Sequence, residues 1–174
     1  LAKLLQEVIT SETFRIYTSG DITGVELGGS LKNIVAIAAG ISDGLGFGTN
    51  TKAALLTRGI VEITRFGVKL GAEKDTFNGL SGIGDLITTA VNPHSRNRSF
   101  GEEIGKGRSS AEILKKTEMV VEGMATTKST YEFAKKLVID LPITSQMYEV
   151  LYNNKLPKDA VKDLMTRSPK QEIL

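Results

Sequence analysis

Residues 24–52 read GVELGGSLKNIVAIAAGISDGLGFGTNTK, and this stretch gives the first indication of the fold class. Its apolar residues recur at the three- and four-residue spacing of a helix that is buried along most of its length: Leu27, Leu31, Ile34, Val35, Ile37 and Ala38. One lysine, Lys32, interrupts this apolar run. Lysines on half-buried helices usually bend their stems to the surface, so a solvated side chain is the ordinary interpretation of Lys32. The stretch alone leaves open whether this lysine also has a function.

The rest of the chain after residue 21 is helical in pattern. Residues 51–71 carry one apolar stripe and end on a glycine, which is a typical helix C-cap. Residues 142–154 and 157–167 each begin with a proline, which suits the first turn of a helix. Residues 117–139 predict a further helix with this core stripe: Val121, Met124, Tyr131, Phe133, Ala134 and Leu137. We therefore expect an all-α domain.

The first twenty residues have a different pattern. Leucine, valine and isoleucine form one face of an amphipathic helix over residues 1–9. The segment FRIYTSGD, residues 14–21, indicates a short strand followed by a turn. A helix and a strand ahead of an all-α body suggest the end of a preceding domain. We accordingly divide the chain into residues 1–20, the end of that domain, and residues 21–174, the helical domain.

Composition excludes several classes of function. The 174 residues include no cysteine, which excludes disulfides, thiolate catalysis and cysteine-held zinc, and is compatible with an intracellular location. A single histidine, His94, excludes a multi-histidine metal site, and we expect no metal. A net charge of +2 gives no reason to expect nucleic acid as a partner. The longest uncharged apolar run, residues 34–41, falls short of the roughly 18 residues of a membrane span.

Eighteen glycines punctuate the chain. The segments GLGFGTNTK, residues 44–52, and GLSGIGDL, residues 79–86, lack the spacing of a phosphate loop and of a dinucleotide fingerprint. Neither loop should bind a nucleotide by itself. A glycine inside a helix costs about 1 kcal/mol relative to alanine. Helical glycines therefore indicate that another helix, or a ligand, comes close to the backbone.

Polar residues gather between residues 82 and 107. Asp85 follows two glycines at a probable helix start, where a carboxylate could simply be a cap. The run NPHSRNRS, residues 92–99, offers hydroxyl, amide and guanidinium donors just ahead of a predicted helix. Such donors at a helix N-terminus suit a phosphate dianion, although a solvated basic loop is equally compatible with the local sequence. We assign His94 no catalytic role.

Four segments carry a resemblance to a known family: GVELGGSLKNIVAIAAGISDGLGFGTNTKAAL, LSGIGDLITT, SRNRSFG and VVEG. They resemble, in the same order, the C-terminal, substrate-binding half of the bacterial NAD(P)-dependent glycerol-3-phosphate dehydrogenases. The resemblance implies a helical domain of the 6-phosphogluconate dehydrogenase C-terminal-like type. It also implies that residues 1–20 are the last helix and strand of a Rossmann domain whose glycine fingerprint is not in this chain.

The resemblance implies a role for each matching residue. Lys32 would be the catalytic proton donor and acceptor at the reacting carbon. Contacts to the substrate, a small phosphorylated molecule, would come from seven residues: Lys32, Asn33, Asp85, Thr89, Ser95, Arg96 and Asn97. Contacts to the cofactor, NAD or NADP, would come from three: Arg96, Val120 and Glu122. Most of the cofactor contacts would belong to the missing half.

The implied activity is reversible hydride transfer between NAD(P)H and dihydroxyacetone phosphate, for glycerophospholipid synthesis in the cytoplasm. A homodimer is compatible with such a glycine-rich helical domain, and the chain alone should be inactive. Two alternatives stay open. One is another dehydrogenase of the β-hydroxyacid class that acts on a carboxylate, against which the SRNR segment argues. The other is a non-catalytic all-α interaction module, in which Lys32 and Asp85 form a structural ion pair.

Overall fold

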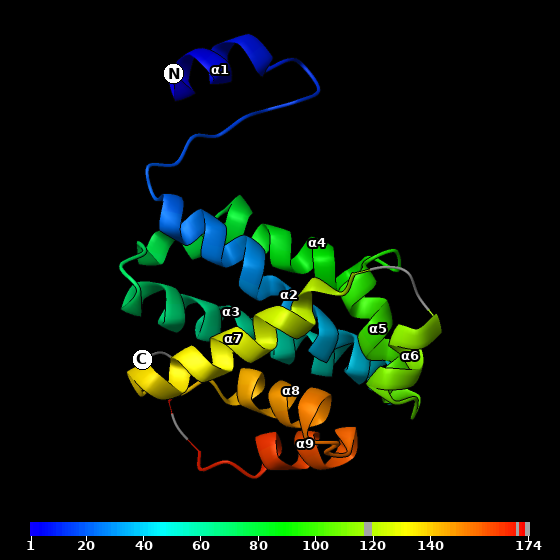
Figure 1. Cartoon of the computed structure of the whole chain (residues 1–174). Coiled ribbons are helices and arrows are strands. Elements are labelled where there is room, and N and C mark those ends of the chain that lie inside the picture. Colours follow the sequence, from blue (N-terminus) through cyan, green and yellow to red (C-terminus); the bar gives the residue numbers. More distant parts are fainter. Residues whose placement is uncertain (117–119, 170, 173–174) are drawn as a thin grey trace.

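A computed structural model describes residues 1–116, 120–169 and 171–172, and it shows helices joined by short loops (Figure 1). Within those residues there is no strand, so the expected all-α fold is confirmed. In chain order the elements are α1 (Ala2–Ile9), α2 (Ile22–Gly44), α3 (Thr49–Lys69), the 3-10 helix η1 (Lys74–Asn78), the π-helical turn η2 (Leu80–Gly84), α4 (Asp85–Val91), α5 (Arg96–Gly105), α6 (Ser110–Lys116), α7 (Glu122–Leu137), α8 (Pro142–Tyr152) and α9 (Pro157–Met165).

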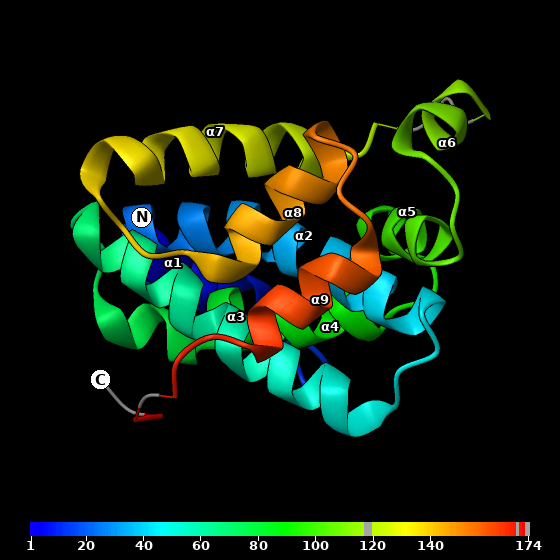
Figure 2. The ribbon, with the colours of Figure 1, turned by 90° about the horizontal axis from the view of Figure 1, so that it is seen from below.

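Helix α2 is the centre of the domain. It is continuously buried from Ile34 to Ser42 and contacts α3, α4, α5, α7 and α8. Helices α8 and α9 close the side of the domain opposite to α1 (Figure 2). By length and composition α2 could cross a membrane, but 61% of its most apolar window is buried inside the domain. That burial is what a core helix requires, and it explains the apolar run around Lys32.

Glycines let α2 and α5 pack with their backbones almost in contact. A Cβ on Gly40 would lie 1.9 Å from the carbonyl oxygen of Arg98, and a Cβ on Gly101 would lie 2.0 Å from that of Ile37. Any larger residue at either position would force the two helices apart. The expected close approach at helical glycines is therefore confirmed. It also holds the start of α5, with its arginines, close to α2.

The expected strand at residues 14–21 is not formed. These residues are extended or turn-like, and α1 stands apart from the other helices without any buried residue (Figure 1). One side-chain hydrogen bond, from Gln6 Nε2 to the carbonyl oxygen of Ile16 at 2.8 Å, joins the two segments. A strand needs a neighbouring strand to pair its backbone groups, and the described residues offer none. The division at residue 20 stays a prediction.

The expected helix over residues 117–139 is correct in its body and in part of its core stripe, but not in its start or at Phe133. Residues 117–119 lie outside the described residues, and α7 begins at Glu122. Phe133, expected in the core, is 47% exposed and touches Phe66 edge-on. Val121 and Ala134 of the expected stripe are buried and Met124 packs against the core, while the other buried positions of α7 are small: Gly123, Thr127 and Thr130. These follow the helical period and allow α7 to approach α2, since a Cβ on Gly123 would lie 2.6 Å from Ile37 Cδ1.

A buried carboxylate, Glu62, holds the start of α8. It is 5% exposed, and it accepts hydrogen bonds from the backbone N–H of Ile143 at 2.6 Å and of Thr144 at 3.2 Å. These are the first free donors of α8, because Pro142 has no N–H. Burial raises the pKa of Glu62 to about 7, while the bonds from Ile143 and Thr144 and the charge of Arg65 oppose the rise.

We expect Glu62 to make the free energy of unfolding depend on pH. Because its folded pKa of about 7 exceeds its ordinary value of 4.5, the unfolded chain loses this proton first as pH rises. The contribution of Glu62 to stability should therefore be complete below pH 4.5 and fall by at most about 3 kcal/mol as pH rises to about 7. In urea unfolding, the free energy of unfolding of the wild type minus that of Glu62→Gln should fall between pH 5 and pH 8. Exposed Glu132→Gln is the control, and a wild type that gains stability relative to Glu62→Gln as pH rises would contradict this account.

Candidate functional site

Lys32 and Asp85 form the centre of the candidate site. The Lys32 Nζ lies 2.5 Å from Asp85 Oδ2, and the two side chains are 20% and 36% exposed. Close packing of α2 against η2 brings the two side chains together. Gly28 lies four residues before Lys32 and Ser81 four residues before Asp85, and a Cβ on Gly28 would lie 2.4 Å from the carbonyl oxygen of Ser81. One helical turn further along each segment, Lys32 and Asp85 face each other. Lys32 is thus neither fully solvated nor fully buried.

Asp85 is the first residue of α4 and makes no capping hydrogen bond, so the cap suggested by the sequence is wrong. Its carboxylate faces Lys32 through Oδ2, and its Oδ1 lies 3.5 Å from the Thr89 hydroxyl. Thr89 sits one turn further along α4, on the same face. Three predicted site residues, Lys32, Asp85 and Thr89, therefore lie together.

The two arginines at the start of α5 have different surroundings. Arg98 is 16% exposed and is held by Asp43 at 2.7 Å and by Glu102 at 3.2 Å. Arg96 is 47% exposed and forms an ion pair with Glu122 of α7. Arg96 is therefore the guanidinium that an incoming anion can reach. The resemblance names only Arg96, but the local sequence gives no physical reason for that choice, because Asp43 lies 55 residues from Arg98.

Ser95 is the N-cap of α5. Its hydroxyl accepts a hydrogen bond from the backbone N–H of Arg98 at 3.3 Å. The N–H groups of the first turn that precede Arg98 have no partner within the helix, as at any helix start. Together with the Arg96 guanidinium they make a place where an anion is stabilised.

A buried amide, Asn97, connects three helices. It is 4% exposed, its Nδ2 donates to Asn33 Oδ1 at 3.0 Å, and its Oδ1 accepts from the backbone N–H of Gly123 at 2.9 Å. A longer contact of 3.4 Å reaches Glu122 Oε2. Since Asn33 follows Lys32 on α2, this network ties the lysine end of the site to the arginine end. Sequence reasoning named these residues but had no signal for the network.

Val120, the remaining predicted site residue, precedes α7 and is 69% exposed.

The site consists of two groups of residues joined through the Lys32–Asn33 backbone. The first contains Lys32, Asp85 and Thr89, and the second contains Asn33, Arg96, Asn97 and Glu122. Each group contains one cation–carboxylate pair, and among the described residues no cluster of three or more metal-ligating side chains occurs. Such a site can bind an anion at Arg96 and move a proton at Lys32.

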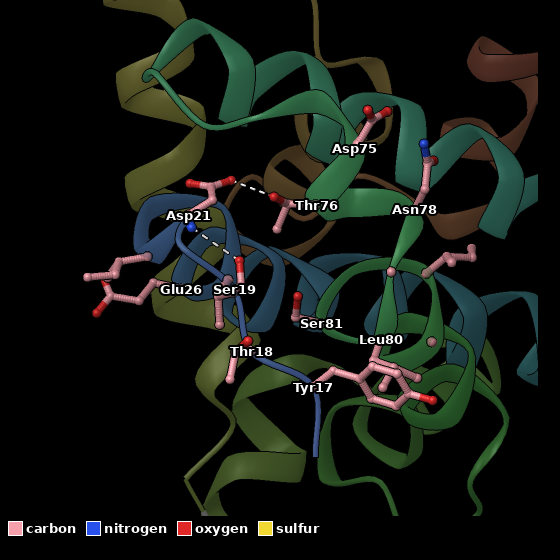
Figure 3. Close-up of a pocket in the computed structure, with 15 residues that line it drawn as sticks. Tyr17, Thr18, Ser19, Asp21, Glu26, Asp75, Thr76, Asn78, Leu80 and Ser81 are labelled. Carbon is pink, nitrogen blue, oxygen red and sulfur yellow. Dashed lines mark hydrogen bonds between the residues drawn. The ribbon is translucent and has the colours of Figure 1, made fainter. Parts of the chain in front are cut away.

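A pocket of about 940 Å³ lies beside this site (Figure 3). Its walls come from the extended segment with Tyr17, the start of α2, and η1 and η2, and its polar rim includes Asp21, which accepts a hydrogen bond from Thr76. Asp21 also caps α2 through the N–H of Gly24 at 2.8 Å. Gly84, the residue before Asp85, lines this pocket, but neither Lys32 nor Asp85 does. We therefore regard the cluster of charged residues, and not this pocket, as the candidate site.

Comparisons with known proteins bear on the whole chain. A family model described as NAD-dependent glycerol-3-phosphate dehydrogenase C-terminus matches residues 21–162. A glycerol-3-phosphate dehydrogenase [NAD(P)+] of Citrifermentans bemidjiense is 55% identical over 172 residues, which cover 99% of this chain and 51% of the relative. Its namesake in Halothermothrix orenii is 53% identical over 175 residues, with the same coverage. The chain thus spans about half the length of the curated relatives it matches.

Solved structures agree with the sequence comparison. The crystal structure of glycerol-3-phosphate dehydrogenase from Coxiella burnetii superposes with a TM-score of 0.89 at 41% identity, covering 95% of this chain and 51% of that one. The structure of a glycerol-3-phosphate dehydrogenase from yeast, Sacharomyces cerevisiae, gives a TM-score of 0.85 at 29% identity and covers 48% of that chain. The likeness therefore extends over nearly all of this chain and about half of each structure.

Proposed function

Since the chain belongs to the family of NAD-dependent glycerol-3-phosphate dehydrogenase C-termini, we propose that it is the substrate-binding half of a glycerol-3-phosphate dehydrogenase [NAD(P)+]. The reaction is the reversible reduction of dihydroxyacetone phosphate to sn-glycerol 3-phosphate, for glycerophospholipid synthesis. The observation that carries the proposal is the pairing of a proton-bearing Lys32 with an anion site at Arg96, joined through Asn33 and Asn97.

Arg96 and the start of α5 bind the phosphate. The guanidinium offers a planar fork of donors, and the first-turn N–H groups add the positive end of the helix. The Asn97–Asn33 bond keeps this end of the site next to α2, and Ser95 caps the start of α5. Fixing the phosphate at one end of a three-carbon substrate fixes the distance of its ketone from Lys32.

Lys32 moves the proton. When hydride reaches the ketone carbon, negative charge grows on the ketone oxygen, and the Lys32 ammonium gives that oxygen a proton to form the alcohol. In the reverse direction the neutral amine takes the hydroxyl proton of glycerol 3-phosphate. Asp85 holds the Lys32 Nζ in place, and Thr89 lies against the other oxygen of Asp85.

The nicotinamide cofactor, when bound, supplies the hydride. We propose NAD or NADP, held mainly by the N-terminal half, with Arg96, Val120 and Glu122 completing its site. These residues suit that role because Val120 is exposed, and because the half-exposed Glu122 carboxylate can accept hydrogen bonds from hydroxyl groups. A cytoplasmic location and a homodimeric assembly belong to the same proposal.

The proposal predicts that activity needs both halves. The full-length protein that contains this chain should oxidise NADH or NADPH when dihydroxyacetone phosphate is added, whereas the purified 174-residue chain should show no turnover. The physical reason is that hydride transfer requires the cofactor site of the missing half. Absorbance at the nicotinamide band measures both. Activity of the 174-residue chain alone, or no turnover of dihydroxyacetone phosphate by the full-length protein, would overturn the proposal.

A further inference from the structure

Glu122 occupies the anion site at Arg96 with its own carboxylate. Its Oε1 is the ion-pair partner of Arg96 Nη2, and its Oε2 lies 3.4 Å from Asn97 Nδ2. The side chains of Arg96 and Glu122 are 47% and 40% exposed, so solvent and small ions reach both. The guanidinium therefore already has an acidic partner before any phosphate arrives.

The backbone beneath this ion pair is fixed. The backbone N–H of Gly123 donates to the buried Asn97 side chain at 2.9 Å. A Cβ on Gly123 would lie 2.7 Å from Asn97 Oδ1, so the start of α7 is packed against α5 with no spare room. Exchange of partners at Arg96 can therefore proceed by rotation of the Arg96 and Glu122 side chains, without movement of either helix.

We propose that Glu122 is an internal competitor of the substrate phosphate for Arg96. The inference rests on the proposed function, because it takes Arg96 as the phosphate ligand. Phosphate binding breaks the Arg96–Glu122 pair, and the freed carboxylate, which is half-exposed, is then solvated by water while Asn97 keeps it nearby. The apparent affinity for phosphate is accordingly weaker than it would be without Glu122.

Glu122→Gln in the full-length enzyme tests this directly. Glutamine keeps the shape and can still accept a hydrogen bond from Asn97, but it has no charge to hold Arg96. Exposed ion pairs of this kind are weak, so inorganic phosphate should bind about 2- to 5-fold more tightly to the variant in calorimetric titrations without cofactor. Glu132→Gln removes the same charge from an exposed position of α7 and should leave phosphate affinity unchanged.

A double variant makes the test specific to Arg96. The gain from Glu122→Gln should disappear when Arg96 is also replaced by alanine, because no guanidinium is left to release. Equal or weaker phosphate binding by Glu122→Gln, or an equal gain in the Arg96→Ala background, would overturn the inference. Turnover of dihydroxyacetone phosphate by the wild type tests the proposed function separately, since the titrations need no reaction.

Discussion

Replacing Lys32 by methionine in the full-length enzyme should lower kcat for dihydroxyacetone phosphate by at least about 100-fold, the usual scale of general acid–base catalysis. Methionine keeps most of the stem's volume but cannot give a proton to the ketone oxygen. Steady-state kinetics in both directions measure the effect.

The matched control for Lys32→Met is Lys128→Met, which removes an exposed lysine from α7 and should leave kcat near the wild-type value. Both variants should retain NADH affinity and the circular dichroism of a helical protein. If Lys32 only formed a structural ion pair with Asp85, the change would lower the melting temperature and leave turnover nearly intact. That result would mean that Lys32 has a structural role only.

Replacing Arg96 by alanine should raise KM for dihydroxyacetone phosphate by roughly 10- to 100-fold, because charge-assisted hydrogen bonds are worth about 1.5–3 kcal/mol. Arg96→Lys should give an intermediate loss, since it keeps the charge but not the planar fork. Initial rates over a range of substrate concentrations measure both.

Free dihydroxyacetone is the control substrate for Arg96, because it has the ketone but no phosphate. Its kcat/KM should be nearly the same in wild type and Arg96→Ala. An equal loss with both substrates would mean that Arg96 does not bind the phosphate. Arg98 would not replace Arg96 as the phosphate ligand, because Asp43 and Glu102 already form ion pairs with it.

The longer helices could be predicted because each carries a local signal. Apolar spacing predicts α2 and α3, and a proline at the first turn marks α8 and α9. The strand at residues 14–21 could not be judged in the same way, because strand formation depends on a partner. Within the expected stripe of α7 only Phe133 proved exposed, because helix–helix proximity favours small residues such as Gly123 and Thr127 on the buried face.

The site shows a different limit. The resemblance named its residues, and one sequence-based alternative paired Lys32 with Asp85, but no local signal joins two residues that lie 53 positions apart. The pairing follows from backbone packing at Gly28, which a single sequence reveals only as an unexplained glycine. The buried roles of Asn97 and Glu62 were equally hidden, since both depend on which helix ends meet in the fold.

Single-turnover hydride transfer in Lys32→Met is the most direct measurement of the central claim that this chain carries the proton-transferring lysine. Enzyme with bound NADH is mixed with saturating dihydroxyacetone phosphate, so that neither substrate affinity nor product release sets the rate. We predict that NADH oxidation is at least about 100-fold slower in Lys32→Met than in wild type, and unchanged in Lys128→Met. Equal single-turnover rates in wild type and a folded, NADH-binding Lys32→Met would contradict the account.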